Sequence, residues 1–376
     1  MKNFVKPKRA LLQTTTLVAA GLIISAVPAD AAEKLKIGVG GYAEQWFGYT
    51  DIQDDGNSTQ DLSGFDVKSD TEIHFKGSTT LDNGLEVGIN VQLEGNSNSS
   101  DQIDESYLTV RGNFGQIDIG DENSALYKTH VAPKEYGMGI NSGDTVDWEL
   151  TGNTSIGDSG YFRAPFGGTY IEPGRANDST KLTYYTPRVE GFRVGVSYAP
   201  DSNQDDNVQP DRDNSSLTDG VMAGIDYSRN FNGVKVAASA GYGTFLEAAG
   251  DNEEPEAYAF GLTVDYAGFQ VGGSYAKFAD SGVNDGDAYV VGAAYDFGQY
   301  GVSATYLHGE REGLDGSTVP GTAQADRDTF ALGGQYILGP GVSLQGTLGY
   351  SEYTSDTAGV GDVEAAYAIT GIRLTF

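Results

Sequence analysis

Few side chains in this sequence could carry out chemistry. There are three histidines, His74, His130 and His308, and no cysteine. A serine hydrolase needs a histidine beside its nucleophile and a third group to orient it, and no such nucleophile is evident beside His308, the best-placed base. Without cysteine, disulfides, thiol nucleophiles and cysteine metal sites are excluded, and three scattered histidines disfavour a transition-metal site. We therefore expect no enzymatic activity and no resident cofactor.

Two further motifs match known ligand sites only in part. Residues 38–43 (GVGGYA) fit a dinucleotide fingerprint by letter, but no strand–helix–strand unit surrounds them. Two acidic segments resemble calcium loops: Asp51, Asp54 and Asp55 before Gly56, and Asp211 with Asp213. Gln53 and Leu62 break the ligand order of the first, and the second fails likewise. Irregular Ca²⁺ binding in the acidic loops stays open, while solvated carboxylates with counterions are the favoured interpretation.

The N-terminus has the form of a secretory signal peptide. Four basic residues precede an apolar stretch from Leu17 to Val27, and Ala29-Asp30-Ala31 follows as a cleavage site. That stretch is too short for the alternative, a membrane anchor. We therefore expect residues 1–31 to be removed and residues 32–376 to form the mature domain. The mature domain has 19 basic and 52 acidic residues, a formal charge of −33.

The C-terminal segment shows a pattern that recurs along the mature chain. In EAAYAITGIRLTF, every second residue from Ala366 to Phe376 lies on one, mostly apolar, face of a strand. Similar segments are connected alternately by a tight turn and by a long polar loop. A transmembrane β-barrel requires this alternation, because short periplasmic turns lie at one rim and long external loops at the other. The sequence therefore predicts an all-β, antiparallel transmembrane barrel.

The connections predict the number of strands. Seven tight turns and eight polar loops give sixteen strands, with both termini on the turn side. Aromatic residues of the apolar face gather near both strand ends, as Tyr258 and Tyr266 do, which predicts two girdles at the membrane interfaces. A hidden hairpin around Tyr161–Ile171 would give eighteen strands, and a soluble β-sandwich is the alternative fold.

The third long loop, residues 121–179, is far longer than a connection needs to be. We expect it to fold inward and to narrow the aqueous channel that a barrel of this size encloses. Its acidic residues would then face basic residues of the wall, and opposed charges of this kind filter ions. The acids are Asp121, Glu122, Asp144, Asp147 and Glu149, and the wall bases are His74, Lys76, Arg111 and Lys181. The alternative is that these acids are ordinary solvated loop residues.

A resemblance to a known family adds to this interpretation. The segment Ile103–Ala125, IDESYLTVRGNFGQIDIGDENSA, combines an acidic-aromatic strand, a Gly-x-Phe-Gly turn and a strand that ends in glycine. It resembles the corresponding segment of alphaproteobacterial general porins. The resemblance implies a homotrimeric, 16-stranded diffusion porin of the Gram-negative outer membrane. It also implies that the third loop forms the eyelet and that Phe376 is the assembly signal.

These observations favour a pore for passive diffusion of small hydrophilic solutes and ions, with a weak preference for cations because of the acidic charge. A substrate-specific porin for sugars or organic acids is the second hypothesis, and a plugged adhesin is the third. The expected partners are outer-membrane lipid and lipopolysaccharide, whose phosphate Lys277 could contact; no nucleic-acid partner is expected.

Overall fold

A computed structural model describes residues 34–54, 61–96, 102–141, 144–149, 163–203, 217–248, 254–279, 285–312, 324–356 and 361–376. The predicted signal peptide, residues 1–31, lies outside these ranges and stays a prediction.

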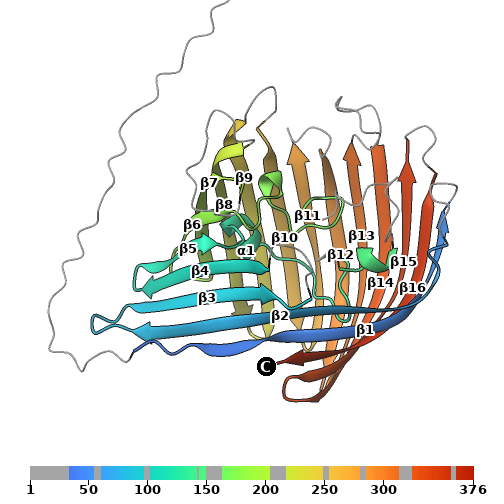
Figure 1. The fold of residues 1–376 in the computed structure, drawn as a ribbon, viewed down its shortest axis with the longest axis horizontal. Coiled ribbons are helices and arrows are strands. Elements are labelled where there is room, and N and C mark those ends of the chain that lie inside the picture. The colour runs from blue at the N-terminus through green and yellow to red at the C-terminus, as the bar shows by residue number, and fades with distance from the viewer. Residues whose placement is uncertain are drawn as a thin grey trace, which may run out of the picture.

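The described residues form sixteen antiparallel strands in one closed barrel, which confirms the predicted fold (Figure 1). The strands are β1 Gly38–Asp54, β2 Gly64–Thr80, β3 Glu86–Glu94, β4 Ile103–Gly112, β5 Gly115–Asp121, β6 Thr180–Tyr185, β7 Phe192–Asp201, β8 Leu217–Phe231, β9 Val234–Ala248, β10 Glu256–Tyr266, β11 Phe269–Ala279, β12 Gly286–Phe297, β13 Tyr300–Glu312, β14 Gln324–Gly339, β15 Val342–Ser355 and β16 Val363–Thr375. The helical segments are α1 Ala125–Thr129, α2 Val146–Glu149 and the 3₁₀ turn η2 Pro173–Arg175.

The barrel closes between its first and last strands. Tyr42 of β1 stands opposite Thr375 of β16, and the antiparallel register continues to Asp54 and Val363. At the chain end, Phe376 exchanges two backbone hydrogen bonds with Gly41, of 2.9 and 3.1 Å. Each strand therefore has a partner on both sides, as a membrane-spanning sheet requires.

The alternative of eighteen strands is wrong for the described chain. Residues 163–171, the described part of the suspected hairpin, contain turns and bends and no strand. The first external connection comprises only residues 55–63, because β1 continues to Asp54 and β2 begins at Gly64. Asp51 and Asp54 of the suspected calcium loop are consequently strand residues.

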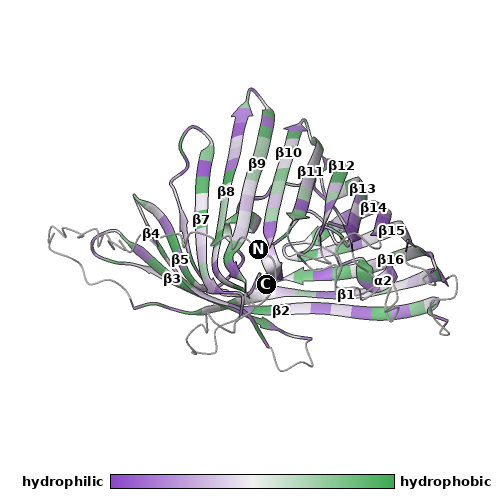
Figure 2. Ribbon diagram, turned by 90° about the horizontal axis from the view of Figure 1, so that it is seen from above, coloured by the Kyte–Doolittle hydropathy of each residue, from purple (hydrophilic) through white to green (hydrophobic). Residues whose placement is uncertain are grey.

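Alternate residues separate two faces of the wall, which Figure 2 shows as bands of opposite hydropathy along the strands. On β14, outward Phe330 and Leu332 are 54% and 59% exposed to the surroundings, whereas inward Arg327 and Thr329 are fully buried. Outward aromatic rings pack against one another near both ends of the strands. Tyr300 and Tyr336 stack at 4.8 Å on the turn side. The period of two residues therefore sorts apolar groups outward.

Tight turns close the hairpins through residues with positive φ. At Ala267-Gly268 both residues have positive φ, 51° and 86°, as a two-residue hairpin turn with the twist of the strands requires. None of the described helices is long and apolar enough to cross a membrane.

Deletion of Phe376 is expected to reduce assembled protein in the outer membrane several-fold, because the two backbone bonds to Gly41 and an outward aromatic ring are lost together. The amount of heat-modifiable barrel in isolated outer membranes measures this. The matched control, Phe376→Tyr, keeps ring and backbone and should assemble normally. Normal levels of the truncated protein would contradict the expectation.

Candidate pore constriction

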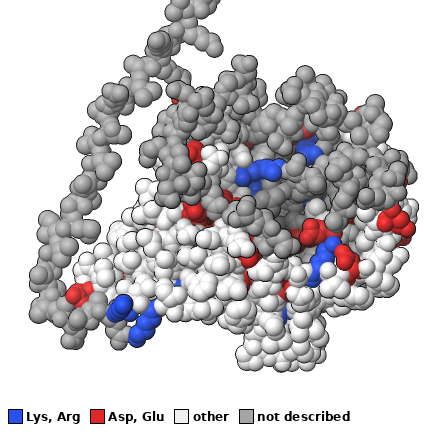
Figure 3. Space-filling model, viewed as in Figure 1, with Lys and Arg blue, Asp and Glu red and all other residues white. Residues whose placement is uncertain are grey.

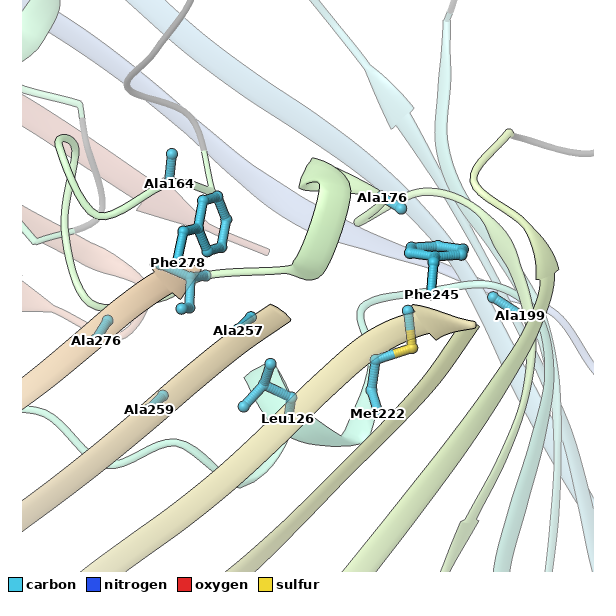
Figure 4. Close-up of a cluster of buried hydrophobic side chains, with 11 residues drawn as sticks. Leu126, Ala164, Ala176, Ala199, Met222, Phe245, Ala257, Ala259, Ala276 and Phe278 are labelled. Atoms are coloured by element: carbon cyan, nitrogen blue, oxygen red, sulfur yellow. The ribbon is translucent and has the colours of Figure 1, made fainter. Parts of the chain in front are cut away.

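The described parts of the third long connection, residues 122–141, 144–149 and 163–179, lie inside the barrel against its inner wall. The connection begins with helix α1, which packs on β7, β8 and β9. Leu126 of this helix is buried in one apolar cluster with Met222 of β8 and with alanines of β10 and β11 (Figure 4). This cluster holds the beginning of the loop against the wall.

After α1 the loop runs along the inner face of the wall toward β15 and is held there by a row of hydrogen bonds. Its backbone N–H groups donate to inward side chains of every second strand: Val131 to Ser239 Oγ of β9 at 2.8 Å, Lys134 to Gln270 Oε1 of β11 at 2.7 Å, Tyr136 to Ser303 Oγ of β13 at 2.9 Å and Met138 to Thr347 Oγ1 of β15 at 2.8 Å. The polar inner face thus satisfies backbone donors that an irregular segment cannot pair within itself.

Glycines on the intervening strands let the loop backbone approach closely. A Cβ atom at Gly261 of β10 would lie 1.6 Å from the carbonyl oxygen of Val131, and one at Gly333 of β14 would lie 1.8 Å from that of Tyr136. Any larger residue at these positions would displace the loop. Hydrogen-bonding side chains and glycines therefore alternate around the wall along the path of the loop.

A buried ion pair holds the far end of the loop, where α2 lies against β16 and β1. Glu149 Oε2 accepts a hydrogen bond from Arg327 Nη2 of β14 at 3.0 Å, and both side chains are completely buried. The hydroxyls of Tyr353 and Tyr367 donate to the same carboxylate. Because a buried charge without its partner is strongly destabilising, this network is the main anchor of α2.

The return leg, residues 163–179, is bonded both to the wall and to the first leg. The Thr169 hydroxyl lies 2.7 Å from Ser274 Oγ of β11. Glu172 Oε1 accepts a hydrogen bond from the backbone N–H of Ser124 at 2.7 Å. Burial raises the pKa of the Glu172 carboxyl, and the charge of Lys181 opposes this effect. The two legs therefore form one layer inside β7–β16.

The inner face of β2–β4 stands across the lumen from this layer, because β3 and β11 are eight positions apart in a ring of sixteen strands. The inward carboxylates of this face include Asp70, Glu72, Glu94 and Glu105. Glu105 Oε1 accepts a hydrogen bond from Asn123 at the root of the loop, at 2.8 Å, which places this acidic wall at the level of the loop. Figure 3 shows acidic and basic groups interspersed over the visible face of the molecule.

The five predicted loop acids do not form one row. Asp121 ends β5 and accepts a hydrogen bond from Thr180 Oγ1 at 2.6 Å. Glu122 is buried and pairs with Lys128 at 2.9 Å, and Glu149 is the buried anchor. Asp144 and Asp147 are exposed. Although its side chain reaches solvent, desolvation by the surrounding protein raises the pKa of the Asp147 carboxyl, and the charge of Lys68 opposes this shift.

Among the predicted wall bases, Lys181 differs most from expectation. It lies opposite Gly120 at the end of the loop and is 2% exposed. Its ammonium group donates to the carbonyl oxygens of Ala176, Asn177 and Ser179 at 2.8, 2.7 and 2.8 Å. The side chain therefore binds the end of the loop to β6 and does not offer an open charge to solutes.

The other three bases lie on the inner face of β2 and β4. His74 Nε2 lies 2.6 Å from Glu72 Oε2, and Arg111 pairs with Glu86 at 3.3 Å near the turns. Lys76 is exposed on the same face of β2, toward the turn side of Glu72. The inner face at loop level is thus mainly acidic rather than basic, and the role of these bases in the constriction stays a prediction.

The roles of Arg327 and of the acidic wall were not predicted. Arg327 follows a polar loop, and no local pattern indicates that its partner is Glu149. The alternation of inward and outward residues along β2 and β3 places Glu72 and Glu94 on the inner face. The same alternation along the late strands could have identified the inward glycines that the loop contacts.

The remaining chemical candidates have structural roles or lie outside the described ranges. His130 contacts Thr169 Oγ1 at 3.1 Å, and burial lowers the pKa of its imidazole to about 4, so it is neutral at pH 7. Asp55, Gly56, Asp211 and Asp213 of the suspected calcium loops lie outside the described residues.

Comparisons with known proteins agree with this architecture. A family model described as Gram-negative porin matches residues 14–356. The major outer membrane protein of Pasteurella multocida is 26% identical over 262 residues, which cover 67% of this chain and 71% of that protein. The chain therefore belongs to the Gram-negative porin family and is a β-barrel of the outer membrane.

Solved structures with the same fold include two proteins of low sequence identity. The anion-selective porin from Comamonas acidovorans has a TM-score of 0.62 and 18% identity, covering 91% of this chain and all of that one, 100%. The trimer form of OmpT from Vibrio cholerae has a TM-score of 0.56 and 15% identity, covering 92% of this chain and 100% of that one. These matches confirm the porin fold; the alphaproteobacterial resemblance and the eyelet residues stay predictions.

Replacing Glu149 by Gln is expected to leave Arg327 buried without a counter-charge and to destabilise the anchored loop by about 3–5 kcal/mol. The barrel should lose heat resistance, and single-channel currents should fluctuate more because the tip is released. Gel mobility after heating and planar-bilayer recording measure the two effects. Asp144→Asn, an exposed neighbour, is the matched control. Unchanged heat resistance and current noise in Glu149→Gln would contradict the anchoring role.

The loop should be held more firmly in mild acid than in mild alkali. Burial raises the pKa of Glu135 to about 7, although the backbone N–H groups of Ile140 and Asn141 donate to its carboxylate. A carboxyl with a raised pKa in the folded state stabilises that state below its ordinary pKa, and the contribution disappears as the pH rises through about 7. Current noise should therefore increase between about pH 5 and pH 8.

Glu135→Gln should remove this increase, because the amide does not titrate. The difference between wild type and variant separates Glu135 from other titrating groups. An equal pH dependence in both proteins would refute the assignment.

Proposed function

We propose that this outer-membrane porin passes small hydrophilic solutes and ions, with a weak preference for cations. The observation that carries the preference is the inner face of β2–β4, where Asp70, Glu72 and Glu94 face inward at the level of the loop. The carboxylate oxygens of Glu72 and Glu94 lie within 4.8 Å of each other. Acidic groups that line a pore favour cations. The negative formal charge of the predicted mature domain adds to the negative potential of these groups.

The basic side chains near this wall limit the preference. Arg373 of β16 pairs with Glu44 at 2.5 Å, and His74 lies against Glu72. Lys76 and Arg111 add positive charge toward the turn side. We therefore propose selectivity of a few-fold rather than exclusion of anions. The anion selectivity named for the Comamonas protein concerns a structure that is 18% identical to this chain, a likeness that shows the fold alone.

Replacing Asp70, Glu72 and Glu94 together by Asn, Gln and Gln is expected to shift the zero-current potential in a KCl gradient toward the chloride side. The cation preference of the wild type should also weaken in concentrated salt. The Debye length, over which the wall charges act, shortens from about 10 Å at 0.1 M salt to about 3 Å at 1 M. The matched control is Glu86→Gln, near the turns. A wild-type channel that already prefers chloride, or a triple variant with unchanged potential, would refute the charge assignment.

We also propose a homotrimer that buries the outer face of β1 and β2. That face carries the exposed aromatic residues Phe47 and Phe65, stacked at 5.5 Å, beside outward Ser69 and Thr71. Polar groups in contact with hydrocarbon are costly, so a neighbouring barrel covers them more favourably than lipid does. The trimer named for the Vibrio protein is consistent with this assembly.

Light scattering corrected for bound detergent should give three times the mass of one barrel. Ser69→Arg places a charge in the proposed interface and should yield single barrels. Phe260→Tyr, a mild change on the outer face of β10, is the control and should stay trimeric. The mass of a single barrel for the wild type would contradict the proposal.

A further inference from the structure

A pocket of about 240 Å³ lies where α2 approaches the loop-side end of β1 and β2. It is lined, among others, by Thr50 and Ile52 of β1, Asp66 and Lys68 of β2 and Trp148 of α2. The four strand residues belong to the inward set of their strands, so the pocket lies on the lumen side of the wall. The long loops are external, and a solute that enters from outside therefore passes the pocket before it reaches the acidic wall.

An ion pair forms one side of this pocket. Lys68 Nζ donates to Asp66 Oδ2 at 2.7 Å, and the backbone N–H of Val67 donates to Asp66 Oδ1 at 2.7 Å. The ammonium group also lies 5.0 Å from the centroid of the Trp148 ring, whose electron-rich face attracts cations. The side chains of Lys68 and Asp66 are 22% and 55% exposed. The pocket therefore presents a donor and an acceptor that are held side by side and that a solute can reach.

The rest of the lining limits the size and the polarity of a solute. Asp147 of α2 adds a second carboxylate, and Ile52 and Leu62 add apolar surface. The Thr50 hydroxyl donates to the backbone carbonyl of Trp148 at 2.7 Å, so β1 and α2 keep a fixed spacing across the pocket. Sites for drug-sized ligands measure about 300–1,000 Å³, and this smaller pocket therefore suits a smaller solute.

Within the diffusion pore proposed above, on which this inference rests, we propose that the pocket binds a monosaccharide in its ring form. A hydroxyl group both donates and accepts hydrogen bonds, so two neighbouring hydroxyls can bridge the ammonium of Lys68 and the carboxylate of Asp66 while the ion pair stays intact. The C–H groups of the sugar ring then contact Ile52 and Leu62. A simple anion is repelled by the carboxylates of Asp66 and Asp147, and a simple cation is repelled by Lys68.

A zwitterionic amino acid is the competing occupant, because its two charges could pair with Asp147 and Lys68. Its carboxylate would have to take the ammonium group of Lys68 away from Asp66, which is bonded to it at 2.7 Å. An uncharged solute needs no such exchange of partners. The ion pair therefore favours the sugar, and the amino acid is an outcome that the experiment below distinguishes.

The first experiment uses the fluorescence of Trp148. The chain has two tryptophans, Trp46 and Trp148, which belong to one buried cluster, so Trp46→Phe leaves Trp148 as the single indole. The purified full-length variant in detergent is titrated with D-glucose, L-alanine and choline in separate series. We expect a saturable change with glucose and none with the other two. No saturable change with glucose, or a larger response to alanine or choline, would overturn the proposal.

Two further substitutions in this background test the contacts. Lys68→Met removes the donor and Asp66→Asn removes the charge of the acceptor, and each should raise the midpoint of the glucose titration about tenfold, as the loss of a hydrogen bond to a charged group does. Because glucose is uncharged, a changed pore charge does not alter its concentration at the pocket. Glu364→Gln, an outward acid of β16, is the matched control. Equal midpoints in Lys68→Met and the control would refute the site.

Planar-bilayer recording of the protein with both tryptophans tests the site and the pore separately. Glucose on both sides should reduce the current in a saturable way, and Lys68→Met should need about tenfold more glucose for the same reduction. An open channel whose current falls only as the conductivity of the bulk solution falls would overturn the binding site and leave the diffusion pore intact. A protein without ionic current would refute the proposed function, whereas the fluorescence titration would still decide whether the pocket binds glucose.

Discussion

Every backbone N–H and C=O group within a bilayer must find its partner inside the protein. In this chain the requirement is met by pairing β1 with β16, which leaves the sheet without an edge. Closure and the period of two residues together create an inner face that water can reach, and sixteen strands enclose more space than their own side chains fill. A connection between two strands can then enter the lumen, provided that the wall satisfies its backbone.

The wall and the third loop are complementary for this reason. Ser239, Gln270, Ser303 and Thr347 accept hydrogen bonds from loop N–H groups, and the glycines between them make room for the loop carbonyls. The pair of Glu149 and Arg327 then fixes α2. Because the loop occupies one side of the lumen, the opposite wall of β2–β4 decides which charges a passing ion meets. The electrostatics of the pore therefore depend on how the loop is anchored.

The fold could be predicted from the sequence because its determinants are local. Alternation along β16, the turn residues at Ala267-Gly268 and the limits of the long loop at Asp121 and Thr180 each involve a few neighbouring residues. The pore constriction could not be predicted in the same way, because it depends on contacts between segments that are distant in the sequence. Glu149 was expected to face the lumen, but Arg327, far along the chain, buries it. Lys181 has the inward position that the alternation predicts, yet the end of the loop covers it. Opposed rows of acids and bases were thus a reasonable hypothesis that three-dimensional packing altered.

The loop covers the inner face of the late strands and leaves the acidic wall of β2 and β3 open to ions. The absence of cysteine from the sequence makes a direct test possible. Single cysteines at Glu94 of the acidic wall and at Ser303 beneath the loop would be treated with a charged thiol reagent during planar-bilayer recording. We expect a rapid fall in current for Glu94→Cys and little change for Ser303→Cys. Rapid block at Ser303→Cys, or none at Glu94→Cys, would contradict it.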